Sequence, residues 1–293
     1  DPDDPSNFAK AVKDNTKVIY AETIGNPKLD VIDISEVSKT AKKEKIPFIV
    51  DNTVATPYLI KPIEYGADIV IHSTTKYITG NGTSIGGIII DAGKFDWSSG
   101  NFSEFTEPSP GYHGLIYHEA LGPAAFIAKA RIEGLRDLGS APSPFNCFQT
   151  IQGLETLSVR IKKHSENALK VAQWLESQKE VAWVNYPGLE SSRYYELSKK
   201  YLKDGQSGVV TFGLKKGFEA GKKLTDSTKI FSLLANFGDS KSLIIHPAST
   251  THQQLSKDEQ KQTGVTSDLI RLSIGLEDPN DLINDLSESM KRI

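Results

Sequence analysis

The stretch Asp68–Lys76, of sequence DIVIHSTTK, decides the fold class, because a short β-branched apolar run ends in hydroxyls and an amine. A second run, Phe48–Val50, ends in the same way at Asp51. Runs of this kind are typical of strands buried in a parallel sheet. Since such strands present their functional groups at their carboxyl ends, we expect Asp51, two hydroxyls and Lys76 to meet at one edge of the sheet.

Strand-like and helix-like segments alternate around this stretch. The alternation predicts βαβ units and a mostly parallel α/β sheet, because each parallel pair of strands needs a crossover. A Gly-rich strand is expected to follow the Lys76 segment. The predicted elements are the strands Val18–Glu22, Phe48–Asp51, Asp68–Ser73 and Ser84–Asp91 and the amphipathic helix Ile34–Lys45.

The pattern changes after residue 92. Gly, Pro and aromatic residues between Gly93 and Tyr117 predict a long loop, followed by long helices at Glu119–Leu138 and Asn146–Gln178. Between these helices, Ser140–Pro144 carries two prolines and marks a domain boundary. We therefore expect a large domain over residues 1–140 and a linking helix with a smaller domain over residues 141–293.

The smaller domain reads as α+β. Its expected elements are the strands Val181–Val184, Val209–Leu214, Lys229–Leu234, Leu243–His246 and Leu269–Ile274 and the helices Tyr194–Lys203, Ser256–Thr263 and Pro279–Met290.

Composition narrows the class of protein. The chain has 293 residues, a formal charge of −3 and an isoelectric point near 6.1, so no basic field indicates a nucleic-acid partner. Its one cysteine, Cys147, excludes an intrachain disulfide and a cysteine metal cluster, and favours a cytoplasmic location. No apolar run reaches the roughly 20 residues that span a bilayer, so no membrane partner is expected.

The groups expected at the sheet edge suit pyridoxal phosphate. An amine can form a Schiff base with it, a carboxylate can pair with its pyridinium nitrogen, and hydroxyls can bind its phosphate. Each residue also has an ordinary interpretation: Lys76 as a surface lysine, and Asp51, Ser73 and Thr75 as turn or helix caps. Their joint placement after successive strands favours the cofactor.

Arg271 lies inside a strand-like run, Asp268–Gly275. A buried arginine needs an anionic partner, which can be an internal carboxylate or the carboxylate of a substrate. A guanidinium fits a carboxylate with two parallel hydrogen bonds. Both interpretations stay open on the sequence alone.

Two other motifs fail. The loop Gly80–Gly87 lacks the third glycine of a dinucleotide fingerprint, since that position is Ile85, and it precedes a strand instead of a helix. Ser73–Lys76 matches S-x-x-K, but the chain has no K-T-G partner and the segment is a poor helix. The six histidines show no metal-ligand spacing, so no metal site is expected.

Taken together, these segments resemble the Cys/Met-metabolism family of pyridoxal-phosphate enzymes. The resemblance extends over nearly the whole chain in the family's order. It implies the fold of type I, aspartate aminotransferase-like, transferases. The segments that carry it are Glu22–Pro27, Val50–Thr53, His72–Tyr77, His246–His252 and Leu269–Gly275.

The resemblance also implies roles for individual residues. Lys76 would hold the cofactor covalently and then move protons, and Asp51 would pair with the ring nitrogen. Asn236 and Arg271 would bind the substrate, with Arg271 on its carboxylate. The cofactor-binding set would be Asn26, Asp51, Thr53, Ser73, Thr75 and Lys76.

Within the family, Gly82–Gly87 and Glu104–Gly114 resemble the O-acetylhomoserine sulfhydrylase branch, although Thr79–Asn81 replaces its usual Gly-Gly-His. The implied reaction converts O-acetylhomoserine and sulfide to homocysteine and acetate, in methionine and cysteine biosynthesis. The alternatives are a cystathionine γ-synthase or γ-lyase, or a non-catalytic fragment that acts as an assembly partner. We expect the family's N-terminal portion to be missing, and a homotetramer built as a dimer of dimers.

Overall fold

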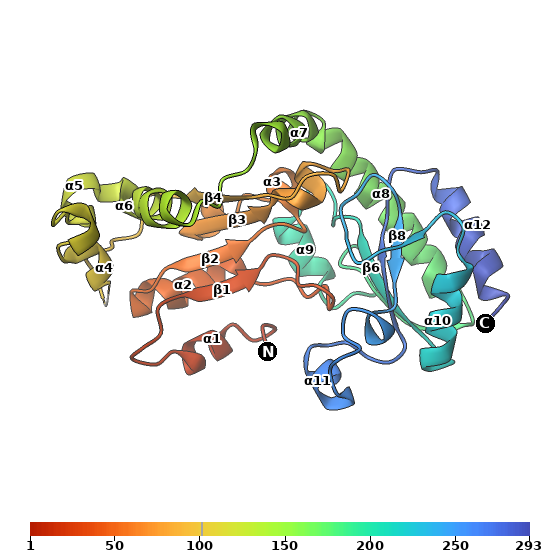
Figure 1. Cartoon of the computed structure of the whole chain (residues 1–293). Helices are drawn as coiled ribbons and strands as arrows, with labels where there is room; N and C mark the ends of the chain where they lie inside the picture. Colours follow the sequence, from red (N-terminus) through yellow and green to blue (C-terminus); the bar gives the residue numbers. More distant parts are fainter. Residues whose placement is uncertain (101) are drawn as a thin grey trace.

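Two β-sheets organise the computed structural model, which describes residues 1–100 and 102–293 (Figure 1). The first sheet has the order β1-β2-β3-β4, in which β1, β2 and β3 are parallel and β4 is antiparallel to β3. The parallel α/β prediction is thereby confirmed. The strands are β1 (Ile19–Glu22), β2 (Phe48–Asp51), β3 (Ile69–Ser73) and β4 (Gly87–Asp91).

The second sheet has the order β5-β6-β9-β8-β7, and its neighbours are antiparallel except for the parallel pair of β7 and β8. It lies beside the first sheet (Figure 1). All five strands fall within or next to the predicted segments, but β7 shrinks to two residues. The strands are β5 (Val181–Asn185), β6 (Val209–Leu214), β7 (Ser232–Leu233), β8 (Leu243–Ile245) and β9 (Leu269–Ser273).

Helices and short turns connect the strands. The α-helices are α1 (Ser6–Ala11), α2 (Ile34–Glu44), α3 (Thr56–Leu59), α4 (Ser103–Thr106), α5 (Tyr117–Leu121), α6 (Ala125–Lys129), α7 (Pro144–Glu155), α8 (Leu157–Glu176), α9 (Tyr195–Tyr201), α10 (Gly217–Ser227), α11 (Lys257–Gln262) and α12 (Pro279–Met290). The 3₁₀ and π turns are η1 (Pro62–Tyr65), η2 (Thr74–Ile78), η3 (Pro110–Tyr112), η4 (Gly122–Ala124), η5 (Ala130–Arg136) and η6 (Pro247–Ser249).

Helix α2 shows why the sequence folds as predicted. The Asp33 side chain caps its first turn by accepting a hydrogen bond from the Glu36 N–H, and Lys45 ends it in the left-handed conformation. Its buried face includes Val37 and Ala41, which pack with Val50 of β2 in one core cluster. An aromatic cluster around Trp97 covers the opposite face of the first sheet.

Two helix predictions were too long. The segment Glu119–Leu138 is broken at Gly122, whose φ of +48° does not continue a helix, and Pro123 starts a 3₁₀ turn there. Asn146–Gln178 divides into α7 and α8 at Thr156, which leaves helical geometry with φ −105° and ψ 1°. The predicted loop Gly93–Tyr117 holds α4 and η3, and its Asn101 lies outside the described residues.

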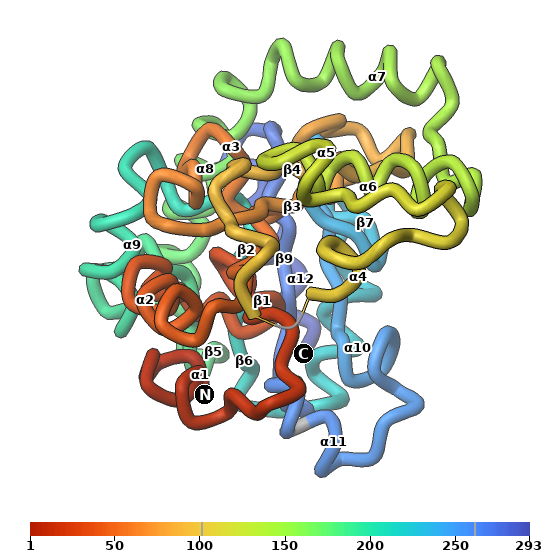
Figure 2. Tube along the Cα trace, turned by 90° about the vertical axis from the view of Figure 1, so that its left-hand side faces the viewer, coloured from red at the N-terminus to blue at the C-terminus, as the bar shows by residue number. Residues whose placement is uncertain are grey.

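Apolar side chains remain exposed at the outside of α7, which both views place at the periphery of the molecule (Figures 1 and 2). We call four of them the α7 face: Phe145, Phe148, Ile151 and Leu154 are 65%, 57%, 55% and 49% exposed. Each is three residues from the next, so neighbouring members lie close together, and the four spread over about half of the helix circumference. Across the described ranges, no helix combines the length and apolar character that crossing a membrane requires.

Candidate active site

Lys76 lies in η2, directly after the carboxyl end of β3. Its backbone departs from helical geometry, with φ −89° and ψ −131°. The amine donates a hydrogen bond to Asn236 Oδ1 and lies 4.9 Å from the centre of the Phe237 ring. Burial, and then the positive charge of Arg271, lower the pKa of Lys76, which favours a neutral amine.

Asp51 ends β2 at the same edge of the first sheet. Its Oδ1 accepts a hydrogen bond of 2.9 Å from the Thr53 N–H, and the Thr53 hydroxyl accepts one of 2.8 Å from the Ser73 N–H. The structure thus brings together Asp51, Thr53 and Ser73 from the ends of two neighbouring strands. Topology explains this arrangement, since β2 and β3 are parallel and pair from Ile49 with Ile69 onward.

Arg271 projects from β9 of the second sheet towards the first. Its Nη1 donates to Asn26 Oδ1 at 3.1 Å, and its Nη2 donates to the Asn236 carbonyl at 3.2 Å. Its guanidinium carbon lies 5.9 Å from the Phe237 ring centre, and burial lowers its pKa. Amide oxygens meet the guanidinium in these contacts, so the fork has the geometry to receive a carboxylate in their place.

Thr75 is held by the loop before β4. Its hydroxyl donates to the Gly86 carbonyl at 3.3 Å and accepts from the Gly86 N–H at 3.1 Å. These contacts fix the turn against the Gly-rich segment. The phosphate contact expected from Thr75 stays a prediction.

Two neighbours of the predicted residues were not singled out from the sequence. The Tyr20 hydroxyl donates to Asp51 Oδ2 at 3.2 Å, and the Phe237 ring lies near both the Lys76 amine and the Arg271 guanidinium. Tyr20 could have been found by strand periodicity, because it is two residues from the end of β1 and shares a sheet face with Glu22. Phe237 gives no comparable signal.

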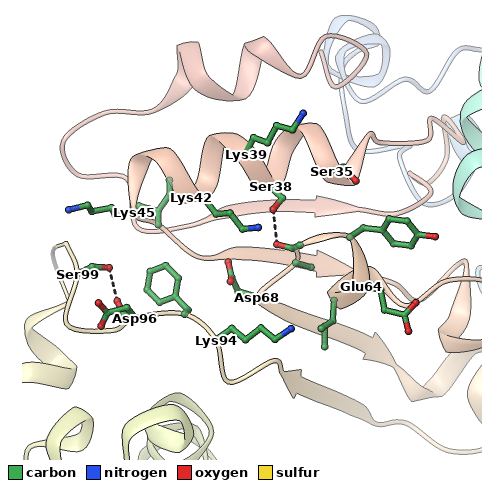
Figure 3. Close-up of a pocket in the computed structure, with 16 residues that line it drawn as sticks. Ser35, Ser38, Lys39, Lys42, Lys45, Glu64, Asp68, Lys94, Asp96 and Ser99 are labelled. Carbon is green, nitrogen blue, oxygen red and sulfur yellow. Dashed lines mark hydrogen bonds between the residues drawn. The ribbon is translucent and has the colours of Figure 1, made fainter.

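A cavity of about 620 Å³ lies at the opposite, amino-terminal ends of β2 and β3 (Figure 3). Its lining includes four lysines, but carboxylates are interspersed among them, and the Asp68 carboxylate accepts a hydrogen bond from the Phe48 N–H. The charges therefore largely compensate one another. Because the strands deliver Asp51 and Lys76 to the other edge, this cavity is not part of the candidate active site.

An α/β fold with an aspartate and a lysine at strand ends, and an arginine from a second sheet beside the same aromatic ring as the lysine, is typical of enzymes that use pyridoxal phosphate. The comparisons with known proteins identify the family. The sequence matches the family described as Cys/Met metabolism PLP-dependent enzyme over residues 1–291. The chain belongs to this family, and its cofactor is pyridoxal 5′-phosphate.

Individual relatives are similar over almost the whole chain. An O-acetyl-L-homoserine sulfhydrylase of Leptospira meyeri is 54% identical, with 100% of this chain and 68% of that protein covered. A homocysteine/cysteine synthase of Saccharomyces cerevisiae is 48% identical, with 99% and 68% covered. The crystal structure of a putative O-acetylhomoserine (thiol)-lyase from Campylobacter jejuni, solved with N′-pyridoxyl-lysine-5′-monophosphate, has a TM-score of 0.95 at 46% identity, with 99% and 70% covered.

The residues present fit the cofactor. The Lys76 amine is partly buried and has a lowered pKa, as a lysine that attacks a carbonyl requires. The Asp51 carboxylate and the Ser73 side chain share a sheet edge with it, so groups for the ring nitrogen and for the phosphate are both available.

Proposed function

We propose that this chain catalyses a γ-replacement, in which O-acetylhomoserine and sulfide give homocysteine and acetate. One observation carries the proposal: the side chains of Lys76 and Arg271 both contact the same short segment, Asn236–Phe237. A proton-transferring amine thereby lies close to a group that binds an amino-acid carboxylate. The names of the relatives support the choice of substrates.

Each residue of this group has one task in the proposal. Arg271 binds the substrate carboxylate through its two terminal nitrogens. Lys76 Nζ takes the proton from Cα and later returns it, and its lowered pKa favours the neutral amine that this task needs. Asn236 holds the amine through its Oδ1. When bound, pyridoxal phosphate supplies an electron sink that stabilises negative charge at Cα.

We also propose which residues hold the cofactor. Asp51 pairs with its ring nitrogen, since the Thr53 N–H and the Tyr20 hydroxyl already orient that carboxylate. With the cofactor bound, Asn26 would contact its phenolic oxygen and Thr53 would support its ring. Ser73 and Thr75 bind the phosphate, while Lys76 forms the covalent link.

The substrate assignment can be separated from its alternatives by the products. Supplying cysteine in place of sulfide distinguishes a cystathionine γ-synthase, and γ-elimination from cystathionine distinguishes a γ-lyase. O-acetylserine as acceptor tests the cysteine synthase activity that the name of the yeast relative includes. Homocysteine formed from O-acetylhomoserine and sulfide, at a rate above these alternatives, is the expected result.

The assembly and the location are further parts of the proposal. The exposed α7 face supports a homo-oligomer, which we propose to be a tetramer built as a dimer of dimers, because four large apolar side chains on one helix are rarely left in water. We propose a cytoplasmic location and two domains, residues 1–140 and 141–293. Sedimentation velocity of the chain and of F148E tests the assembly, and an unchanged sedimentation coefficient would contradict a role for α7.

The deciding experiment is borohydride reduction of the chain with pyridoxal phosphate, followed by peptide mapping. The expected result is a pyridoxyl group on Lys76. A label on another lysine, or folded protein without a label, would contradict the assignment of Lys76.

A further inference from the structure

Arg160 of α8 forms hydrogen bonds with the end of η2, the turn that contains Lys76. Its Nη1 donates to the Tyr77 carbonyl at 2.8 Å, and its Nη2 donates to the carbonyls of Ile78 at 3.1 Å and Gly153 at 2.7 Å. Its Nε donates to the Thr156 hydroxyl at 3.1 Å. These partners are carbonyl and hydroxyl oxygens of two chain segments, so the guanidinium joins η2 to the break between α7 and α8.

The carbonyls that Arg160 binds come at the carboxyl end of η2, where a helical turn leaves acceptors without partners inside the turn. A cation at this end is favoured by the direction of the peptide dipoles. The turn itself is irregular at Lys76. It is closed by one π-type hydrogen bond, from the Thr79 N–H to the Thr74 carbonyl, and by one α-type bond, from the Gly80 N–H to the Lys76 carbonyl. Such a short turn depends on its surroundings for a fixed shape.

Further contacts of the turn come from His164, on the same helix as Arg160, and from Gly208 and Gly238 in loops next to the second sheet. The fully buried Tyr77 ring lies 5.2 Å from the His164 ring, and its hydroxyl accepts a hydrogen bond of 3.2 Å from the Gly208 N–H. Gly238 lies so close that a Cβ there would be 2.6 Å from the Tyr77 nitrogen. The backbone next to Lys76 is thus closely packed, and Arg160 adds hydrogen bonds to its carbonyls.

We propose that Arg160 is a positioning residue for Lys76. By holding the carbonyls of Tyr77 and Ile78, it sets where the flexible lysine side chain starts, and therefore where its amine lies relative to Asn236 and Asp51. The inference rests on the proposed function of Lys76 as the reacting amine. Displacing a reacting group by about 1 Å costs on the order of 10²-fold in rate.

The test uses R160Q and R160K, with R193Q as the matched control, since Arg193 is an exposed arginine that pairs with Asp3. In R160Q we expect the amides of Thr79 and Gly80 to exchange with deuterium faster, because the turn opens more often. We expect kcat to fall about 10²-fold with KM little changed, and the pH at which the absorbance of the lysine-bound cofactor changes to shift. R193Q should match the wild type in all three measurements.

R160K separates positioning from charge. A lysine keeps the charge but cannot reach three carbonyls in a planar fork, so it should resemble R160Q. It also serves if R160Q does not fold. In R160A, added methylguanidinium should restore slow amide exchange and part of kcat.

Normal amide exchange, absorbance titration and kcat in folded R160Q and R160K would overturn the inference. Amide exchange is measured without cofactor, so it still decides the role of Arg160 if the wild type fails to take up pyridoxal phosphate. That failure would contradict the proposed function alone.

Discussion

The edge strand β4 of the first sheet and the interior strand β6 of the second sheet differ in how deeply their side chains are buried. All six residues of β6 are buried, whereas Ile88, Ile89 and Ile90 of β4 are 47%, 48% and 37% exposed. The interior of the second sheet is therefore covered by other side chains of the described residues, and we call it the closed sheet. The first sheet, which we call the open sheet, exposes apolar side chains of β4 beside β3, the strand that precedes Lys76. The proposed chemistry lies at the edge of the first sheet, and the second sheet carries Arg271.

The largest expected effect tests whether the open sheet carries the chemistry. K76A should lower kcat/KM for homocysteine formation by about 10⁴-fold, because it removes the group that moves protons, and it should abolish pyridoxyl labelling at this position. Far-UV circular dichroism should be unchanged. K42A, on the exposed side of α2, is the control and should retain activity. Substantial turnover by K76A would contradict the proposal that the first sheet carries the reacting amine.

The second effect compares the packing of the two strands. F212A in β6 should lower the free energy of unfolding by about 3–5 kcal/mol, as is typical of a buried phenylalanine. I89A in β4 should cost less than about 1 kcal/mol, because half of its side chain is already in water. Urea unfolding measures both. Equal costs would mean that β4 is covered in solution, for example by another subunit.

The third effect is a pH dependence of the free energy of unfolding, which we assign to His164 of α8, a helix whose buried face packs beside the second sheet. His164 is fully buried, its Nδ1 lies 2.6 Å from the Ile274 carbonyl oxygen, and burial lowers its pKa from 6.5 to about 4. At pH values between 4 and 6.5, His164 is therefore protonated in the unfolded chain and neutral in the native state. Its contribution to stability is present above pH 6.5 and is lost as the pH falls towards 4, by about 3 kcal/mol in total.

Urea unfolding of the wild type and of H164N between pH 7 and pH 4 measures this contribution. The variant should show a shallower pH dependence, whatever its stability at pH 7. H113Q changes an exposed histidine and should retain the wild-type slope. Parallel slopes for H164N and the wild type would assign the acid sensitivity to other groups.

The smallest expected effect concerns Arg271, which links the two regions. R271K should lower kcat/KM for O-acetylhomoserine roughly 10–100-fold, equivalent to losing about 1.5–3 kcal/mol from a charged hydrogen bond. The loss should come mainly through KM, because the carboxylate is bound equally before and during reaction. Steady-state kinetics check this, with R292K near the carboxyl terminus as the control. A fall in kcat alone would indicate that Arg271 positions Lys76 instead of the substrate.

The strands were predictable because short β-branched runs carry a strong local signal, and β2 and β6 have the predicted bounds. The position of Lys76 and Asp51 at one sheet edge was predictable for the same reason, since parallel strands bring their carboxyl ends together, and their roles stay a prediction. The contact of Arg271 with Asn26 joins residues 245 positions apart, and spacing cannot reveal it. Only the resemblance to the family placed both in one site.

Other features depend on tertiary structure that local patterns do not encode. Arg160 looks like an ordinary polar residue on a helix surface, because its acceptors are backbone carbonyls contributed by other segments. The breaks at Gly122 and Thr156 also escaped prediction. Apolar periodicity continues across both positions, although the backbone does not remain helical there.

The β4 strand has a consequence for handling the protein. An edge strand with three consecutive isoleucines, to which no further strand of the described residues pairs, is a template for cross-β aggregation. We expect the isolated chain to precipitate on concentration, at a rate set by encounters between β4 edges. A lysine in place of Ile89 would act as a gatekeeper, and would allow the chain to be studied at the concentrations that crystallisation and NMR require.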